Sequence, residues 1–515
     1  MPNSSPFNRT VARSAMLVAG FFAVDKALGV VRDAVIGRAF GASAALDAYY
    51  AAFELPDGLF NLIAGLALAT ALIPVLAAHT RRGEEGRDEA WRLASTVINW
   101  ALLVVTAVSI LAAIFARQVI QAVAPGFEAE RLLLATGLMR LVLLQTVIAS
   151  VSGIVRSVLQ AHQHFLLPAA APLAYTLGRI AGALLLAPRF GIYGLALGGL
   201  AGTVGHFLIQ VPGLIRYKAR WTPSLRHPDL PAVLRLMGPR MVGLGVTYVN
   251  FVLPTYFGSR LAPGAIASYE YGWRLMQFPE TIIGTALGLT VFPTLAQQAN
   301  AGDRQGLRAT AGWALRLVLA LAIPAAVGLV VLGRPLTALF LQRGAFDAAV
   351  TDRVYRGLQA FALGLIAHSA LEVSSRLFYA QRDMWTPLWA AAAGLATNLV
   401  VSWLLLARLE HVGLALANSL GAGMQVVLLQ AIAARRLAVA EPGTGGGFAA
   451  SLARTLLVSA LMGAAVLGFR ELLPDARLLV AGAGGVAVGG VTFLVAAVLF
   501  GSPELRELPR LLLRR

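Results

Sequence analysis

The chain of 515 residues contains no cysteine and few charged residues, which make up only 13% of the sequence. The lack of cysteine excludes disulfide bonds, thiolate catalysis and metal sites built from cysteine. A soluble protein carries about 25% charged residues, so the low charge argues against a soluble fold. Acidic residues are especially scarce, 25 against 42 basic ones, and the formal net charge is +17.

Hydrophobic residues take the place of the missing charge. They make up 58% of the sequence and raise the mean hydropathy to +0.73. Apolar runs of about 20 residues, the length that crosses a bilayer core, recur from end to end, whereas a β-barrel would show alternating segments of about ten residues. We therefore expect an all-α polytopic membrane protein with about 14 transmembrane helices. The predicted spans are 12–38, 45–78, 92–115, 131–160, 165–187, 191–215, 233–260, 265–297, 309–332, 351–381, 384–407, 411–434, 448–469 and 478–500.

The basic residues lie mostly between the predicted spans, which indicates membrane orientation and attraction to anionic lipid rather than binding of nucleic acid. Every second connection is enriched in Lys and Arg, so we expect both termini in the cytoplasm. The first span is too long for a signal peptide, and we expect it to be retained. The enriched set contains Arg81, Arg82, Arg87, Arg216, Lys218, Arg220, Arg226, Arg304, Arg308, Arg435, Arg436, Arg506, Arg510, Arg514 and Arg515.

An internal repeat has a constant offset of 219 residues. Three pairs share it: Pro74 with Pro293, Pro168 with Pro387, and the GLAL segments that begin at Gly194 and Gly413. Because the offset covers six predicted spans, both copies enter the membrane from the same side, as in parallel-repeat transporters with a site between the two halves. We predict two six-helix lobes around a central cavity, 1–220 and 230–436, and an extra helix pair at 448–501 after the linker Glu441–Gly447.

Charges inside the predicted spans mark the candidate site, because a charge at bilayer depth usually faces a partner or a water-filled cavity. In the first span Asp25 and Arg32 project in nearly the same direction, as do Lys26 and Asp33. We favour a cavity lined by this charged stripe, since burying it against protein alone is costly. The alternative is that the four charges only neutralise one another.

A second charged position is Arg274, which shares a helix face with Glu270 four residues earlier, a favourable spacing for a local pair. If the repeats are symmetric, Arg32 and Arg274 converge on one anion, which the planar guanidinium binds through two oxygens. Arg179, the repeat mate of Asn398, either lines the cavity or holds helices together.

The second span is interrupted by Pro56 and Gly58 and carries Glu54, Asp57 and Asn61. An interrupted helix is tolerated where neighbouring protein or cavity water satisfies the freed backbone, so Asn61 is a candidate cavity residue.

Signals for an enzyme are poor. The sequence has neither a GxxxxGK[ST] nucleotide loop nor an HExxH metal motif, and the seven histidines are scattered. Glu372 and Arg376 are spaced as a structural pair. We expect a transporter without a metal or cofactor, driven by a gradient or working by facilitation.

Two segments resemble the MurJ (MviN) family of lipid II flippases, in the multidrug/oligosaccharidyl-lipid/polysaccharide exporter superfamily. They are LGVVRDAVIGRAFGASAALDAYYAAFELPD at Leu28–Asp57 and YGWRLMQFPETIIGTALGLTVFPTLA at Tyr271–Ala296. The resemblance implies fourteen helices and translocation of undecaprenyl-pyrophosphate-linked disaccharide pentapeptide across the bacterial cytoplasmic membrane for peptidoglycan synthesis. It also suggests that the extra C-terminal pair offers a groove for the polyprenyl tail.

The resemblance assigns roles to individual residues. Arg32, Asp33 and Arg274 match the family's cavity charges around the pyrophosphate, and Asp47 matches an acidic residue near the outer end of the first two helices. Lys26 stands where many members have arginine. Phe60 and Asn61 stand where many members have two arginines, which leaves the substrate open. No acidic residue occurs between positions 242 and 257, so we expect no sodium site there. We expect a monomer that contacts membrane lipids and the cell-wall synthesis machinery.

Three alternatives remain. An exporter of another lipid-linked oligosaccharide, or of small molecules, belongs to the same superfamily. A membrane glycosyltransferase would need a catalytic carboxylate and a large outer loop, but the longest outer connection, 334–353, is short. The charges within the spans argue against a scaffold that transports nothing.

Overall fold

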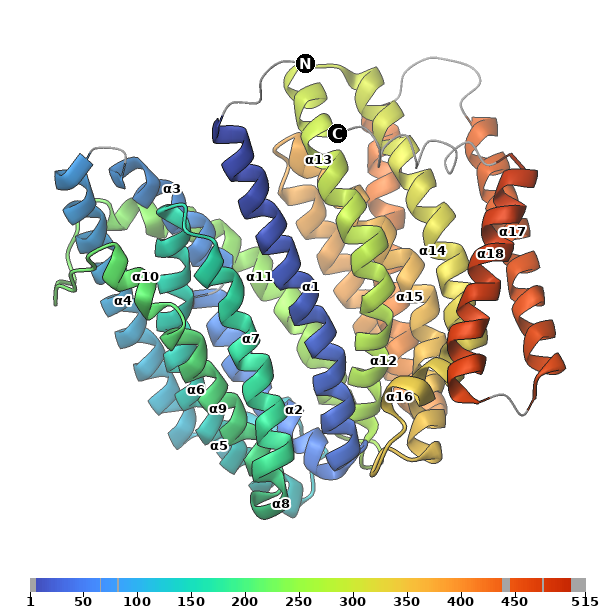
Figure 1. Cartoon of the computed structure of the whole chain (residues 1–515), viewed down its shortest axis with the longest axis horizontal. Helices are drawn as coiled ribbons and strands as arrows, with labels where there is room; N and C mark the ends of the chain where they lie inside the picture. Colours follow the sequence, from blue (N-terminus) through green and yellow to red (C-terminus); the bar gives the residue numbers. More distant parts are fainter. Residues whose placement is uncertain (1–5, 65, 81–82, 438–444, 475–476, 502–515) are drawn as a thin grey trace. The chain divides into compact units, whose positions relative to one another are not determined.

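The computed structural model describes residues 6–64, 66–80, 83–437, 445–474 and 477–501, and every regular element in these ranges is helical (Figure 1). Among these residues, nine helices are long and apolar enough to cross a membrane. These nine helices correspond to ten predicted spans, because α16 corresponds to both 384–407 and 411–434. The other four predicted spans are helical too, as α1, α2 with α3, α11 and α15. The all-α polytopic class is confirmed. Arg81, Arg82, Arg506, Arg510, Arg514, Arg515 and most of the linker Glu441–Gly447 lie outside the described residues.

The described chain forms two compact units, which we call unit 1 and unit 2. Unit 1 comprises the described residues within 1–264 together with 343–345, and unit 2 comprises those within 265–342 and 346–515. This division follows packing, which groups α11 with α2 and α3, so the predicted lobes 1–220 and 230–436 stay a prediction.

The elements of unit 1 run in chain order as α1 (Pro6–Phe40), α2 (Ala44–Leu59), the π-helix η1 (Phe60–Ala64), α3 (Leu66–Thr80), α4 (Gly83–Ile114), α5 (Ala116–Val123), α6 (Ala129–Ala161), α7 (Leu166–Ala181), η2 (Gly182–Leu186), α8 (Ala187–Phe190), α9 (Ile192–Leu208), α10 (Val211–Arg216) and α11 (Leu230–Gly258).

The elements of unit 2 are α12 (Ala265–Glu280), η3 (Thr281–Thr285), α13 (Ala286–Asn300), α14 (Arg304–Leu341), α15 (Ala348–Ala380), α16 (Trp385–Arg436), α17 (Gly445–Leu472), η4 (Val480–Gly484) and α18 (Gly485–Leu499). The extra pair, α17 and α18, packs together and against α14.

The predicted interruption at Pro56 and Gly58 is a widened turn rather than a break. Proline lacks a backbone N–H donor, and the π-helix η1 follows directly after α2, which contains Pro56. Gly58 is needed there because a Cβ would lie 2.4 Å from Cζ of Tyr248. Unit 2 has the same sequence of elements, with Pro279 near the end of α12 followed by η3.

The backbone confirms the internal repeat. Gly191 (φ 58°, ψ −139°) has the same unusual conformation as Glu410 (φ 48°, ψ −132°), and 410 − 191 = 219. Gln163 and Arg382 both have positive φ, 59° and 61°, and 382 − 163 = 219. Residues other than glycine seldom adopt positive φ, and three of these four are not glycine, so two such coincidences at one offset indicate a shared fold.

The cores of the two units repeat as well. One core is shared by α3, α4, α6 and α11, and the other by α13, α14, α15 and α16. Buried residues related by 219 positions occur in both: Leu72 and Val291, Leu76 and Leu295, Val158 and Leu377, and Ala161 and Ala380. The sequence repeat therefore reflects repeated packing.

Small residues allow α7 and η2 to approach α9 closely. A Cβ on Gly198 would lie 2.4 Å from Cα of Gly182, and one on Gly178 would lie 2.5 Å from Cα of Gly202. Close backbone contact of this kind replaces the hydrophobic driving force that helices lack in lipid.

Replacing Gly198 by valine should therefore destabilise unit 1 by about 1–3 kcal/mol, because neither backbone can move away without losing the contact. Thermal unfolding in detergent measures the effect. Gly490→Val in α18 is the matched control, since apart from the local backbone of its own helix no described atom lies within 4 Å of its Cβ position. An equal loss in both variants would contradict the packing argument.

Asp383 fixes the turn between α15 and α16. Its carboxylate accepts hydrogen bonds from the backbone N–H groups of Trp385 (3.0 Å) and Thr386 (2.9 Å), from the Thr386 hydroxyl and from the Arg436 guanidinium (both 2.6 Å). Burial alone would raise the pKa of Asp383, but the hydrogen bonds from Thr386 and Arg436 outweigh it and lower this pKa to about 2.

Asp383→Asn should lower the free energy of unfolding by about 1 kcal/mol, as for other lost helix caps. Because the pKa is lower in the folded protein, the carboxylate stabilises the fold above about pH 4 and loses this effect as the pH falls toward 2. The difference in unfolding temperature between wild type and variant should thus be constant near neutral pH and shrink in acid. A difference that does not change with pH would contradict this role.

Candidate functional site

The charges of α1 are held by partners within unit 1. The Arg32 guanidinium donates from Nε to Asp33 Oδ1 (3.0 Å) and has Nη2 at 2.9 Å from the same atom, and both side chains are largely buried. Thr176 of α7 donates to Asp25 Oδ1 (3.0 Å). Lys26 is exposed, with Nζ at 5.4 Å from the centre of the Phe22 ring. The stripe therefore contains a partly buried ion pair and an exposed cation.

The polar residues of α2 and η1 mostly bind the helices around them. Asp47 is 1% exposed and accepts from the Gly264 backbone N–H (2.6 Å), which ties the start of α2 to the segment after α11. Glu54 accepts a hydrogen bond from the Thr255 hydroxyl of α11. Asn61 is exposed and donates to the Asp57 carbonyl (2.8 Å).

Arg179 is buried between aromatic rings. Its guanidinium lies 5.5 Å from the centre of the Tyr49 ring and 5.7 Å from that of Tyr175. Its repeat mate Asn398 is also buried, and accepts from Ser402 (3.1 Å). Stacking on aromatic rings from α2 and α7 suits a cation that holds helices together, while its use as a cavity residue stays a prediction.

In unit 2, two arginines each pair with a carboxylate one turn earlier in the same helix. Arg274 Nη2 lies 3.4 Å from Glu270 Oε2, and both side chains are partly buried. Arg376 pairs with Glu372 in α15, as its spacing predicts. Gly288 leaves room for this pair, because a Cβ there would lie 2.5 Å from Nη1 of Arg376.

The structure thus brings Arg32 to Asp33 and Arg274 to Glu270. Arg32 belongs to unit 1 and Arg274 to unit 2. Their convergence on one anion stays a prediction, as do the roles proposed for Lys26, Asp47, Asn61 and Arg179.

Sequence reasoning missed a polar arrangement at one end of unit 1, where the segment 217–229 runs along α4. We call this segment the linker strap. Side chains at three successive turns of α4 hold it: Trp91 donates to the Tyr217 carbonyl (3.1 Å), Ser95 to the Arg220 carbonyl (3.2 Å), and Asn99 to the Thr222 and Ser224 carbonyls (2.8 and 2.9 Å).

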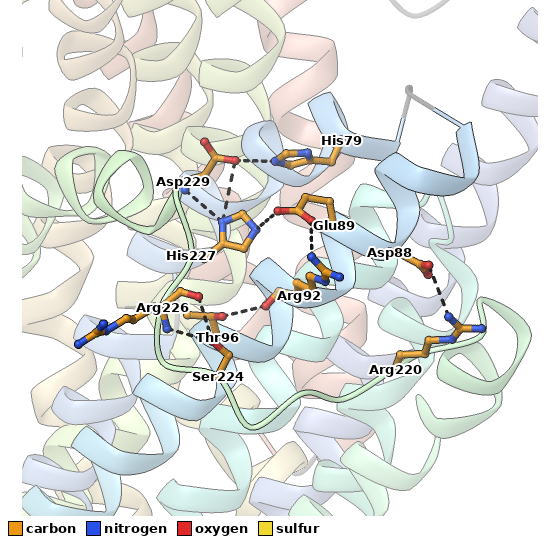
Figure 2. Close-up of polar contacts among 10 residues, drawn as sticks. All are labelled: His79, Asp88, Glu89, Arg92, Thr96, Arg220, Ser224, Arg226, His227 and Asp229. Carbon is orange, nitrogen blue, oxygen red and sulfur yellow. Dashed lines mark hydrogen bonds and ion pairs between the residues drawn. The ribbon is translucent and has the colours of Figure 1, made fainter.

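The far end of the linker strap is clasped by histidines and carboxylates (Figure 2). His79 Nε2, at the end of α3, lies 2.7 Å from Asp229 Oδ2. The Asp229 backbone N–H donates to His227 Nδ1 (3.1 Å), so the proton of neutral His227 is on Nε2, which lies 3.1 Å from Glu89 Oε1. We call these four side chains, His79, Glu89, His227 and Asp229, the clasp.

In the described residues no group of three or more His, Asp or Glu side chains is arranged to hold a metal ion.

The near end of the linker strap also meets histidines. The Tyr217 ring lies 4.9 Å from the His162 ring and 5.9 Å from the His164 ring, measured between centres. Burial lowers the pKa of both histidines and favours their neutral forms. Histidines that are scattered along the sequence thus come together in the fold, His79 with His227 and His162 with His164 around Tyr217. One sequence signal was available: Trp91, Ser95 and Asn99 share a helix face at four-residue spacing.

The fold is shared with solved structures of other proteins. A solved structure of the lipid II flippase MurJ in an inward closed conformation superposes with a TM-score of 0.79 at 23% identity, covering 94% of this chain and 98% of that one. An inward-facing multidrug resistance MATE family transporter of the MOP superfamily gives 0.68 at 14% identity, covering 80% of this chain and 94% of that one.

The sequence narrows the class to one family. The family model described as "Lipid II flippase MurJ" matches residues 36–480. The lipid II flippase MurJ of Burkholderia cenocepacia is 32% identical over 448 residues, which are 84% of this chain and 85% of that protein. The probable lipid II flippase MurJ of Vibrio cholerae is 26% identical, covering 82% of each. This chain belongs to the MurJ family of lipid II flippases, and is a multi-pass membrane transporter rather than an enzyme.

If Asn99 anchors the linker strap, Asn99→Ala should speed hydrogen exchange of the amides in 217–225 by about tenfold, since the variant loses bonds worth about 1 kcal/mol or more in total. Mass spectrometry of peptides from this segment measures the change. Asp88→Asn serves as the control, because the exposed Asp88 carboxylate makes only a 3.4 Å contact with Arg220. Unchanged exchange in Asn99→Ala would contradict the anchoring role.

Proposed function

We propose that this chain moves lipid II, the undecaprenyl-pyrophosphate-linked disaccharide pentapeptide, from the inner to the outer leaflet of the bacterial cytoplasmic membrane for peptidoglycan synthesis. The observation that carries the proposal is the family match over residues 36–480. The ion-paired arginines in α1 and α12 support it, because an anionic headgroup needs replacement of its water on the way through the membrane.

Arg32 and Arg274 are the proposed ligands of the pyrophosphate. A guanidinium binds phosphate oxygens in the planar, two-point geometry that it uses with carboxylates. Asp33 orients Arg32 before the substrate arrives, and Glu270 does the same for Arg274. The Arg274–Glu270 contact of 3.4 Å is longer than a typical charge-assisted hydrogen bond. In this proposal a phosphate oxygen takes the place of the Glu270 carboxylate.

Alternating access would come from rocking of the two repeat halves around the bound headgroup. The glycine contacts between α7, η2 and α9 give that half a closely packed core. The sequence has no nucleotide-binding loop, so the driving force in this proposal is a gradient or the substrate's own concentration difference.

The extra helix pair is the proposed support for the polyprenyl tail, an assignment that rests on family analogy. Within unit 2, α17 and α18 pack on α14, where Gly463 faces Val327 and Gly485 faces Leu332. The large exposed apolar side chains of α18, among them Leu494, suit a hydrocarbon partner.

Both termini would face the cytoplasm, and the chain would work as a monomer in contact with the cell-wall synthesis machinery. The second candidate is an exporter of another lipid-linked oligosaccharide. Phe60 and Asn61 favour it, because they replace two arginines found in many members of the family and reduce the positive charge beside the substrate path.

The decisive experiment is translocation of fluorescent lipid II in proteoliposomes by the full chain. Wild type should transport, and Arg32→Ala and Arg274→Ala should each lose at least tenfold in rate, because each variant lacks a charge-assisted contact worth about 1.5–3 kcal/mol. Arg32→Lys should keep part of the activity, since it retains charge without the two-point geometry.

Arg189→Ala is the matched control, because Arg189 is an exposed arginine of the short helix α8. Equal unfolding temperatures of all variants would show that they fold alike. Wild-type activity in Arg32→Ala and Arg274→Ala would sink the proposed anion site. Failure of folded wild type to move lipid II, together with transport of another lipid-linked sugar, would favour the second candidate.

A further inference from the structure

An apolar groove of about 720 Å³ runs beside the linker strap along an exposed face of α4. The helix contributes Leu102, Leu103 and Ile110, and the strap contributes Trp221, Pro223 and Leu225. Most of these side chains are large, hydrophobic and more than 40% exposed. An exposed apolar patch of this kind on a membrane-spanning helix suits contact with lipid.

The groove exists because the strap is fixed. Trp221 Nε1 donates to Asn99 Oδ1 (2.9 Å), which holds the indole at the Asn99 end of the groove. Trp100 Nε1 donates to the Leu225 carbonyl (2.8 Å). Two indoles that are anchored through their N–H groups and expose their rings are typical of the interface between headgroups and hydrocarbon.

Two arginines of the linker strap stand next to residues that line this groove. Arg226 follows Leu225 directly, and Arg220 precedes Trp221. The Arg226 side chain points away from the clasp in Figure 2, and no ion pair of its guanidinium is found among the described residues. Arg220 makes a 3.4 Å contact with Asp88 in which both side chains are exposed. Arg226 is thus an exposed cation one residue from the groove-lining Leu225.

The dimensions suit a fatty acyl chain. The lining residues of α4 extend from Asn99 to Ile110, which at 1.5 Å per residue is roughly 16 Å of helix. The strap and its cations lie at the end of α4 nearer to Gly83, where the clasp joins residues 79–92 to 227–229. The positive-inside pattern assigns both of these connections to the cytoplasmic side.

We propose that this groove is a binding site for an anionic phospholipid of the cytoplasmic leaflet. Its phosphate would pair with Arg226, and one acyl chain would lie along α4 between Leu103 and Trp221. The occupied site would hold the linker strap on α4, in the segment that joins α10 to α11. This site differs from the proposed lipid II site, since it uses none of the charges of α1 or α12.

Quenching of tryptophan fluorescence by brominated lipids tests the site in the full chain, reconstituted in bilayers. The signal of the groove is the fluorescence of wild type minus that of Trp221→Phe. Brominated phosphatidylglycerol should half-quench this signal at a mole fraction about fivefold lower than brominated phosphatidylcholine, the selectivity expected of one cation at a membrane surface. Arg226→Gln should remove the preference, and Arg189→Gln should leave it intact.

A second variant tests binding of the acyl chain in the groove separately from the contact between Arg226 and the phosphate. Ala107 is exposed in the groove wall, and Ala107→Phe should reduce quenching by both lipids because the ring fills the space of the acyl chain. Equal quenching by the two lipids in wild type, or a preference that survives Arg226→Gln, would overturn the proposal. Loss of the phosphatidylglycerol signal on adding lipid II at an equal mole fraction would overturn it as well, since the groove would then belong to the transported lipid. None of these readouts depends on transport.

Discussion

A hydrocarbon medium solvates neither charges nor backbone polar groups, so each of them must find a partner within the chain or in a cavity. This constraint explains the polar contacts of the helices. Arg32 is paired with the carboxylate next to it, Asp25 with the hydroxyl of Thr176, and Glu54 with that of Thr255. The buried Asp47 accepts from a backbone N–H. These partners lower the free-energy cost of a charge inside the membrane. A substrate anion has to compete with them for the arginines.

The same medium explains why small residues and proline shape the packing. Without a hydrophobic force between helices, stability depends on close contact, which Gly182 and Gly198 permit. Prolines in the helices release backbone groups that the π-helical segments help to satisfy. Both devices recur in the two halves of the chain. Duplication thus preserved the backbone conformation at Gly191 and Glu410 even though only one of them is a glycine.

The linker strap adds a polar element to an otherwise apolar unit. Its carbonyls are satisfied by side chains of α4 instead of by a helix of its own, and its ends are held by ring contacts and by the clasp. Such an extended segment can be docked firmly and still be released at moderate cost, because few apolar groups are buried under it. A lipid in the adjacent groove would add to its retention. The strap therefore couples the surroundings of α4 to the chain leading into α11.

Much of this protein was determined by its sequence alone. Low charge and long apolar runs fixed the membrane class, the constant offset of 219 fixed the duplication, and four-residue spacing predicted the pairs Glu270–Arg274 and Glu372–Arg376, because all of these depend on local periodicity. The tertiary structure alone decided which polar groups meet across the chain. His79 and Asp229 are 150 residues apart, and the partners of Asp47 and Glu54 are separated from them by 217 and 201 residues. No periodicity connects such positions, since only the folding of one helix onto another brings them within hydrogen-bonding distance.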